Sequence, residues 1–219
     1  MELDITEIKL SKKDLEKGIH LPESLSPELA YLCGIIVGDG SIYYRKDKKD
    51  YALKVVGNPK DERELYDEVI SVHFKKVFEF IPNFKFHDSN TTYGFMIQSK
   101  SMMLFLTEKI GLLKGKKDEN LCIPEIFKVD DQLIKSFIRG LFDTDGCMCF
   151  KKRYKLFPYY PVISLSSSSK KLISEVALYL KSESFKVVEI YDYKILDSRF
   201  KNGFSMINRV EMNGRTNLR

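Results

Sequence analysis

The sequence predicts a mixed α/β (α+β) fold made of two similar halves, each in the order αββαββα. The nonapeptide LCGIIVGDG at 32–40 returns as IRGLFDTDG at 138–146, with glycines and an aspartate in matching places. Strand-like and helix-like apolar periods follow both copies in the same order. With 219 residues, 43% of them hydrophobic, the chain can form two cores. We therefore expect a pseudo-twofold duplication.

In the first half, the nonapeptide lies on a predicted helix. Ser26 is a favourable N-cap and Pro27 suits the first helical position, so the helix begins there and ends near Asp39. The patterns that follow predict strands over 41–46 and 51–56, a helix over 61–78, strands over 84–87 and 93–98, and a helix over 102–113.

The second half repeats this order. Asp130 or Asp131 can cap its nonapeptide helix, and Ser169 lies in the N-cap region of a later helix. The patterns predict strands over 147–154 and 159–165, a helix over 170–184, and strands over 186–191 and 203–212.

A polar stretch at 115–120 separates the halves. We place the first pseudo-domain at 1–120, including an N-terminal extension, and the second at 121–219. Leu218 and Arg219 align with the first turn of a helix that only the first half completes. The second half is therefore expected to lack its last helix and to leave apolar surface exposed.

Composition and charge narrow the function classes. The 36 Lys and Arg against 31 Asp and Glu give a net charge of +5, which suits a polyanionic partner without requiring one. No apolar run approaches the roughly 18 residues of a membrane helix, and the first residues, MELD, do not resemble a signal peptide. We expect a soluble, cytoplasmic protein without a membrane partner.

The four cysteines, at 33, 122, 147 and 149, are too few for a disulfide scaffold. The pair at 147 and 149 has no second pair and no nearby histidine, which disfavours structural zinc. We expect buried thiols. Hydrolase arrangements of serine, histidine or cysteine are not recognisable either.

Small residues four apart lie on one face of each nonapeptide helix. Gly34 and Gly38 form this strip in the first helix, and Gly140 and Thr144 form it in the second. Such strips let two backbones approach closely, so we expect the helices to pack together. We expect Gly40 and Gly146 to end the helices in the left-handed conformation.

Asp39 and Asp145 then fall in the last turns of their helices, where the macrodipole disfavours negative charge by about 0.3–1 kcal/mol. If the helices pair, the two carboxylates also repel each other. A hard divalent cation offsets both penalties, and Mg²⁺ retains waters that can attack a phosphodiester. The residues therefore favour a metal site at the two helix ends.

The doubled nonapeptide, with IPE at 123–125 and FIRGLF at 137–142, resembles the LAGLIDADG homing endonucleases of the single-chain, two-motif type. The resemblance covers nearly the whole chain. It implies two central motif helices flanked by saddle-shaped antiparallel sheets that lie in the DNA major groove. It also implies a monomeric, intron-encoded, metal-dependent enzyme that cuts double-stranded DNA at a long, specific site, using Mg²⁺ or Mn²⁺, with Ca²⁺ as a non-catalytic substitute.

By the same resemblance, Asp39 and Asp145 bind metal and the carbonyls of Gly40 and Gly146 are additional ligands. Lys116, in the Lys-rich loop that closes the first half, is the candidate catalytic lysine. Residues on or beside the predicted hairpins are candidate DNA contacts, because alternate side chains of a two-stranded ribbon project into a major groove; they are Tyr43, Arg45, Lys54, Lys151, Arg153 and Lys155.

The lysine counterpart in the second half would fall beyond Arg219. Its absence from this sequence favours an alternative: a non-catalytic or nicking-only DNA-binding relative. A second alternative is an RNA-binding maturase that acts on intron RNA with the same scaffold. The target sequence cannot be read from one chain, because part of the readout is DNA shape.

Overall fold

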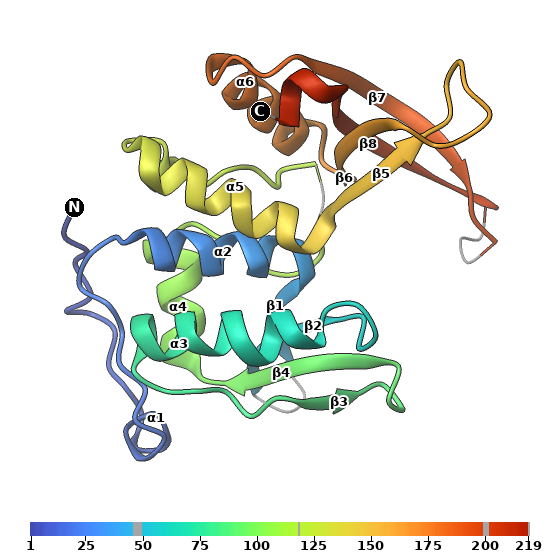
Figure 1. Ribbon diagram of the computed structural model, residues 1–219. Coiled ribbons are helices and arrows are strands. Elements are labelled where there is room, and N and C mark those ends of the chain that lie inside the picture. Colours follow the sequence, from blue (N-terminus) through green and yellow to red (C-terminus); the bar gives the residue numbers. More distant parts are fainter. Residues whose placement is uncertain (46–49, 118, 199–201, 219) are drawn as a thin grey trace. The chain divides into compact units, whose positions relative to one another are not determined.

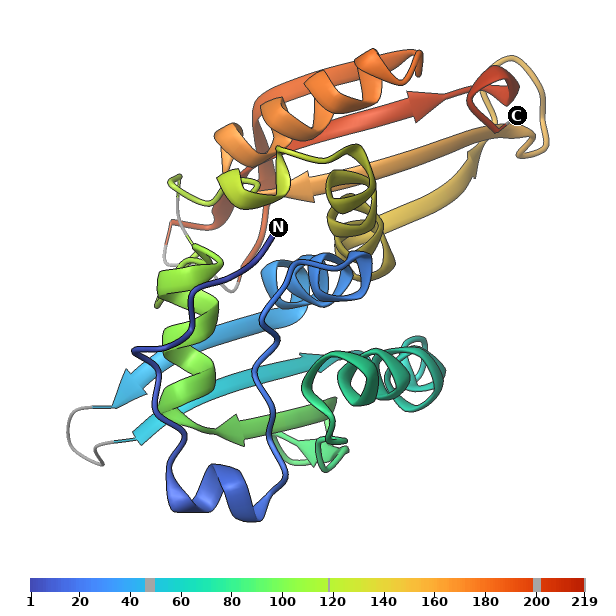
Figure 2. The ribbon, with the colours of Figure 1, turned by 90° about the vertical axis from the view of Figure 1, so that its left-hand side faces the viewer.

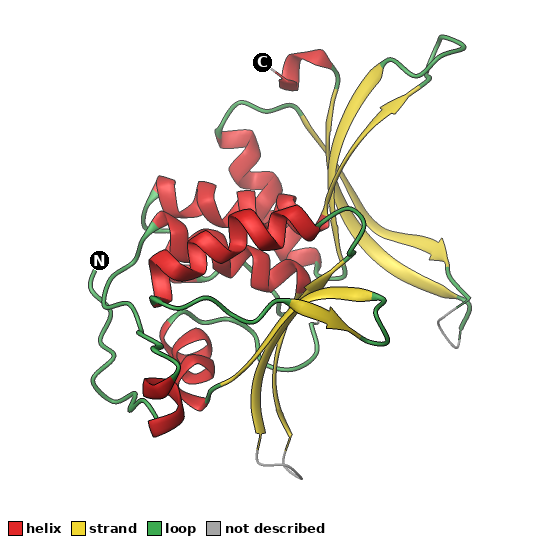
Figure 3. Cartoon of the chain, turned by 60° about the horizontal axis from the view of Figure 1, so that its bottom comes forward, coloured by secondary structure: helices red, strands yellow, loops and turns green. Residues whose placement is uncertain are grey.

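The computed structural model describes residues 1–45, 50–117, 119–198 and 202–218 (Figure 1). Two units emerge from the internal contacts: Met1–Lys116 with Pro124–Thr144, and Lys117–Ile123 with Asp145–Arg219. None of the described helices is long and apolar enough to cross a membrane. Each unit contains one four-stranded antiparallel sheet, drawn in yellow in Figure 3. The predicted mixed α+β class is confirmed.

The sheet of the first unit has the order β1-β2-β4-β3. Its strands are β1 Gly40–Arg45, β2 Asp50–Gly57, β3 Lys85–His87 and β4 Thr92–Gln98, all within two residues of the predicted ranges. Register places Ile42 opposite Leu53, which in turn is opposite Ile97, and all three are at most 5% exposed. Their period of two defines the core face of the sheet.

Helices cover this core face (Figure 2). The predicted helix over 61–78 is a π-helical segment, η1 Leu65–Ile70, continued by α3 Ser71–Phe78. The helix predicted over 102–113 is α4 Lys100–Leu104 with η2 Phe105–Lys109, and so ends four residues early. Phe74 of α3 stacks edge-on against Phe95 of β4 with ring centroids 4.8 Å apart.

The N-terminal extension is fastened to this unit through α1 Lys12–Glu16. Asp14 is 1% exposed and closes a capping box with Ser11. Ser101 of α4 donates hydrogen bonds to the Asp14 carboxylate at 3.1 Å and to the Lys9 carbonyl at 2.9 Å. Burial opposes the charge on Asp14, but the hydrogen bonds outweigh it and lower the pKa of its carboxyl.

The two nonapeptide helices are α2 Pro27–Asp39 and α5 Asp131–Asp145, and they pack through their glycines as predicted. A Cβ atom added to Gly34 would lie 2.1 Å from the Phe137 carbonyl oxygen, and one added to Gly140 would lie 2.3 Å from the Tyr31 carbonyl oxygen. Only glycine permits backbones to approach this closely. This contact holds α5 to the first unit.

Side chains cap the starts of both helices. The Ser26 hydroxyl accepts a hydrogen bond from the Leu29 N–H at 3.1 Å. At α5, Asp130 is the capping residue, because its carboxylate accepts from the N–H groups of Gln132 and Leu133.

The predicted left-handed glycines at the helix ends are wrong. Gly40 has φ −89° and ψ 162°, which is extended backbone, and Gly146 begins a strand without a positive φ. The reason is that each helix runs directly into a strand, so the chain must become extended at once. Gly40 is needed for space instead, since an added Cβ would lie 2.5 Å from the Ile36 carbonyl oxygen.

The sheet of the second unit has the equivalent order, β5-β6-β8-β7. Its strands are β5 Gly146–Lys151, β6 Tyr160–Ser167, β7 Val187–Leu196 and β8 Phe204–Asn213. The helix α6 Lys170–Ser182 starts at the Ser169 cap and packs on β6, β7 and β8. Short 3₁₀ turns occur at η3 Glu125–Phe127, in the first unit, and η4 Arg215–Leu218.

The core face of β5 is less covered than that of β1. Ile42 is 2% exposed, whereas Met148 and Phe150, on the matching face of β5, are 56% and 54% exposed. In the first unit α4 packs on the neighbouring strand β2. Large apolar side chains of β5 are therefore exposed in the second unit.

The thiols only partly match expectation. Cys33 is buried, but Cys147 is exposed on β5, and all four cysteines are free. Cys147 lies on the face of the strand opposite to Met148, away from the α6 side.

Candidate active site and nucleic-acid interface

Asp39 is the last residue of α2 and is half buried. The Tyr66 hydroxyl donates a hydrogen bond to its Oδ2 at 2.9 Å. Tyr66 is fully buried, and burial together with the nearby carboxylates of Asp39 and Glu62 raises the pKa of its hydroxyl far above the usual value. Tyr66 therefore stays protonated and can only donate to the carboxylate.

Asp145 is the last residue of α5 and directly precedes β5. The residue as a whole is exposed, but the protein packed around its carboxyl removes hydration and raises the pKa of that carboxyl above the ordinary 3.8. The positive charge of Lys117 opposes this rise. Asp39 and Asp145 thus have different surroundings.

Each terminal carboxylate by itself suits a hard cation that keeps much of its own hydration. Among the residues that the structure describes, no three Asp, Glu, His or Cys side chains gather into a metal cage. Each motif helix instead contributes one terminal carboxylate. Mg²⁺ is commonly held this way, by one or two carboxylates together with water and substrate phosphates.

Lys116 is exposed and lies in the loop that follows η2. The preceding residue, Gly115, donates its N–H to the Ile42 carbonyl at 2.7 Å and so ties this loop to β1, the strand that follows Asp39. Lys114 lies 5.7 Å from the Tyr44 ring on the same strand. The loop therefore lies against β1, three residues beyond the candidate metal ligand.

The first sheet has an open face opposite its helices. The strand register places Tyr43 of β1 on this face, in one cross-strand row with Ala52 and Gln98. Lys54 lies on the same face, in the next cross-strand row beside Met96. Lys54 is partly ordered by Asp88, whose carboxylate accepts from its ammonium at 2.8 Å. The predicted contact Arg45 ends β1, but its side chain lies outside the described residues.

The open face of the second sheet carries a connected set of charges. Lys151 of β5 lies 3.3 Å from the Glu211 carboxylate, and Arg209 approaches the same carboxylate at 3.7 Å. Arg209 also donates to the Ser166 hydroxyl at 2.9 Å. Glu211 is 7% exposed and holds both cations in place on this face.

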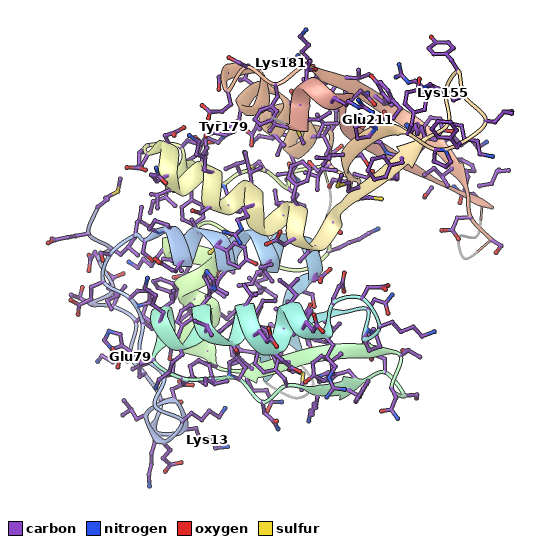
Figure 4. All side chains as sticks on the ribbon, in the orientation of Figure 1. Lys13, Glu79, Lys155, Tyr179, Lys181 and Glu211 are labelled. Atoms are coloured by element: carbon purple, nitrogen blue, oxygen red, sulfur yellow. The ribbon has the colours of Figure 1, made fainter. Side chains whose placement is uncertain are left out.

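Arg153 and Lys155 are not on a strand, because β5 ends at Lys151 instead of continuing to 154 as predicted. Arg153 has φ 45°, a turn conformation incompatible with a strand, and its guanidinium lies 3.7 Å from the Tyr160 ring centroid. The Lys155 ammonium lies 4.9 Å from the Tyr159 ring centroid. Figure 4 shows Lys155 on this outlying loop and Glu211 on β8.

Comparison with known proteins gives the same family that the motifs indicated. Residues 132–210, which span most of α5 and the strands β5 to β8, match the model of the LAGLIDADG-like domain. This part of the chain is therefore a LAGLIDADG-like domain. The match includes the second motif helix, so the glycine contact and the terminal aspartate of that helix belong to a LAGLIDADG domain.

Solved LAGLIDADG structures share the fold. A structure of the homing endonuclease I-DmoI with nicked target DNA and Mn superposes with a TM-score of 0.54 at 16% identity, over 84% of this chain and 87% of that chain. I-DmoI with DNA and Ca gives 0.54 at 17% identity, over 85% and 82%. These relatives are bound to DNA, and at this identity they establish the fold alone.

Curated relatives include two large enzymes of Methanocaldococcus jannaschii. Glutamine–fructose-6-phosphate aminotransferase is 30% identical over 128 residues, which are 58% of this chain and 11% of that protein. Reverse gyrase is 25% identical over 185 residues, 82% of this chain and 10% of that protein. Because the chain spans only about a tenth of each relative, their named activities do not transfer to it.

Sequence reasoning missed several residues around the LAGLIDADG motifs. The sequence predicts only that Tyr66 lies on a helix. It does not distinguish Lys117 from the neighbouring lysines of the same loop. Arg209 and Glu211 alternate with the buried Val210 and Met212, and this period of two was the available signal for an open-face position.

Proposed function

We propose that the chain is a site-specific endonuclease that hydrolyses phosphodiester bonds in double-stranded DNA with a divalent cation, acting as a monomer at a long target site. The observation that carries the proposal is the direct connection between site and interface. Each motif helix ends in an aspartate, and the next residue begins a sheet whose open face carries ordered cationic side chains.

In this proposal Asp39 and Asp145 hold the cations, with the carbonyls of Gly40 and Gly146 as further ligands. A bound Mg²⁺ supplies a polarised water and stabilises the leaving oxygen. The exposed ammonium of Lys116 assists by stabilising negative charge on the phosphate. Mn²⁺ replaces Mg²⁺, whereas Ca²⁺ supports binding without cleavage.

The proposed DNA contacts divide between the two sheets. The first sheet contributes Tyr43, Arg45 and Lys54. The second sheet and its loop contribute Lys151, Arg153 and Lys155. Arg209 joins this second group because the strand register places it on the same open face. Lysine and arginine bind phosphates and position the protein, while alternate strand side chains reach base edges. Arg153 and Lys155, on a loop, are suited to phosphate contacts.

Selection from a plasmid library with randomised inserts tests the proposal. We expect purified protein and Mg²⁺ to linearise or nick a subset that shares one long sequence. Asp39→Asn and Asp145→Asn should abolish cleavage on their respective strands while preserving binding, because they remove a cation ligand and not a DNA contact. Asp192→Asn, which alters an exposed acid paired with Lys170, is the matched control.

A nicking-only enzyme is the second candidate, favoured by the different surroundings of Asp39 and Asp145. Duplexes of the selected target labelled on one strand or the other separate the two candidates. Cleavage of both labelled strands supports the double-strand enzyme, and cleavage of one supports a nickase. Specific binding without any metal-dependent cleavage would reject both.

A further inference from the structure

We infer that Tyr66 is a positioning residue for the Asp39 carboxylate. Cation binding at Asp39 then depends on the hydrogen bond from Tyr66, whereas cation binding at Asp145 does not depend on Tyr66. The inference rests on the proposed function of Asp39 as a cation ligand. Tyr66 lies outside the nonapeptide motif, yet by this inference its hydroxyl controls one of the two cation sites.

The position of the Tyr66 hydroxyl is set by packing. The ring is 0% exposed and lies edge-on to Phe84 and Tyr93, with both centroid distances 6.3 Å. Gly94 of β4 leaves room for it, since a Cβ atom there would lie 3.0 Å from the Tyr66 ring. A ring enclosed on these sides cannot swing away, so its hydroxyl donates from a fixed point.

The hydrogen bond determines how the carboxylate can be used. The Tyr66 hydroxyl donates to Asp39 Oδ2 at 2.9 Å, and this bond restricts how the carboxylate can turn toward a cation. Holding the carboxylate in one rotamer also reduces the conformational entropy lost when a cation binds. Loss of a comparable partner of a metal ligand typically weakens metal affinity or activity by about 10–100-fold.

Gly57 and Glu62 restrict the carboxylate from another side. A Cβ atom on Gly57 would lie 1.9 Å from Glu62 Oε2 and 3.0 Å from Asp39 Oδ2, so both carboxylates pass close to the bare backbone of this glycine. The Asn58 N–H donates to Glu62 and holds that side chain in the turn after β2. Asp39 therefore lies between a tyrosine hydroxyl and a glycine.

The second unit is built differently near its motif. The buried residues of α6, which packs on the second sheet, are aliphatic: Leu172, Ile173, Val176, Ala177 and Leu180. They have no hydroxyl to offer a carboxylate. Near Asp145, the positive charge of Lys117 opposes the rise in pKa that burial causes. Removing the Tyr66 hydroxyl should thus affect one site and one DNA strand selectively.

The test compares Tyr66→Phe with the unaltered chain. Tyr93→Phe is the matched control, because it keeps the ring that packs on Tyr66 and removes a hydroxyl that donates to Asp67 at 2.6 Å instead of to Asp39. Binding of Mn²⁺ to the protein–DNA complex is followed by electron paramagnetic resonance, and cleavage of each strand is followed against Mg²⁺ concentration. We expect Tyr66→Phe to weaken about tenfold or more one of the two Mn²⁺ sites and to raise the Mg²⁺ requirement for one strand.

Tyr93→Phe should leave both readouts unchanged, with a loss of thermal stability similar to that of Tyr66→Phe. Unaltered Mn²⁺ binding in Tyr66→Phe, or equal weakening of both sites, would overturn the inference. Mn²⁺ binding is measured without cleavage, so the inference can be judged separately from the proposed activity. Failure of Asp39→Asn to reduce cleavage would instead contradict the proposed function.

Discussion

At the residue scale, the two motif aspartates are chemically unequal although their sequence contexts are equivalent. Asp39 accepts a hydrogen bond from a buried tyrosine, and Asp145 has a raised pKa because its carboxyl is poorly hydrated. A raised pKa means that the ionised form destabilises the folded state. The cation that the proposed activity requires would relieve this destabilisation.

Asp145→Asn should therefore stabilise the metal-free protein at neutral pH. Below the ordinary pKa of 3.8 the carboxyl is protonated in both folded and unfolded chains, so the substitution should have little effect. As the pH rises through and above 3.8, Asp145 loses its proton in the unfolded chain before it does so in the folded chain. The free energy of unfolding of the unaltered chain therefore falls, whereas that of the variant does not fall for this reason. Urea denaturation between pH 3 and pH 7 measures this, and a variant equally or less stable at pH 7 contradicts it.

At the element scale, the pairing of α2 with α5 depends on contacts between backbones. Gly34 and Gly140 each approach a carbonyl oxygen of the other helix, whereas Gly38 meets the side chain of Thr144. A side chain can rotate or shift, but a helical backbone can move only as a unit. The glycines within one motif should therefore differ in tolerance to substitution.

Gly34→Ala should destabilise the protein by about 3 kcal/mol or more, since the added methyl would lie 2.1 Å from a carbonyl oxygen and would push the helices apart. Gly38→Ala, with the Thr144 hydroxyl at 1.9 Å and its Cβ at 2.8 Å, should cost less because the hydroxyl can rotate away and only a smaller shift is needed to relieve the Cβ contact. Thermal unfolding of the two variants is the measurement. A smaller loss for Gly34→Ala than for Gly38→Ala would contradict the backbone contact.

Most elements followed from local patterns, but their ends did not. The polar–apolar alternation of β8 and the caps at Ser26 and Ser169 are local signals, and the structure confirms them. The end of β5 at Lys151 was missed because the turn at Arg153 depends on contact with Tyr160, a residue across the hairpin. The early end of the helix after β4 was missed because apolar residues 110 and 112 are buried without being helical.

At the scale of the whole molecule, each unit presents an open sheet face with cations held by acids. Lys54 is paired with Asp88 in one unit, and Lys151 and Arg209 share Glu211 in the other. Such pairs are partly solvated, so they order the side chains more than they stabilise the fold. On binding DNA, these cations would exchange carboxylates for phosphates and release counterions.

Lys54→Ala and Arg209→Ala should each weaken DNA binding, and a phosphate contact should reduce the slope of log K against log salt by about 0.9. Lys171→Ala, on the exposed side of α6, is the control and should leave the slope unchanged. Fluorescence anisotropy of labelled duplex between low and moderate salt measures the slopes. An unchanged slope with weaker, sequence-dependent binding would mark the residue as a base contact instead.

The sequence by itself determined the duplication, the order of strands and helices, the glycine strips and the two terminal aspartates, because each of these is written in residues close together along the chain. Only the tertiary structure decided that Tyr66 donates to Asp39, that Lys117 acts on Asp145, and that Arg209 joins Lys151 around Glu211. These partners lie far apart in sequence, and a hydrogen bond or charge acts over a few ångströms of space. The repeated motifs therefore specify equivalent backbones, while the side chains packed around them determine how each aspartate behaves.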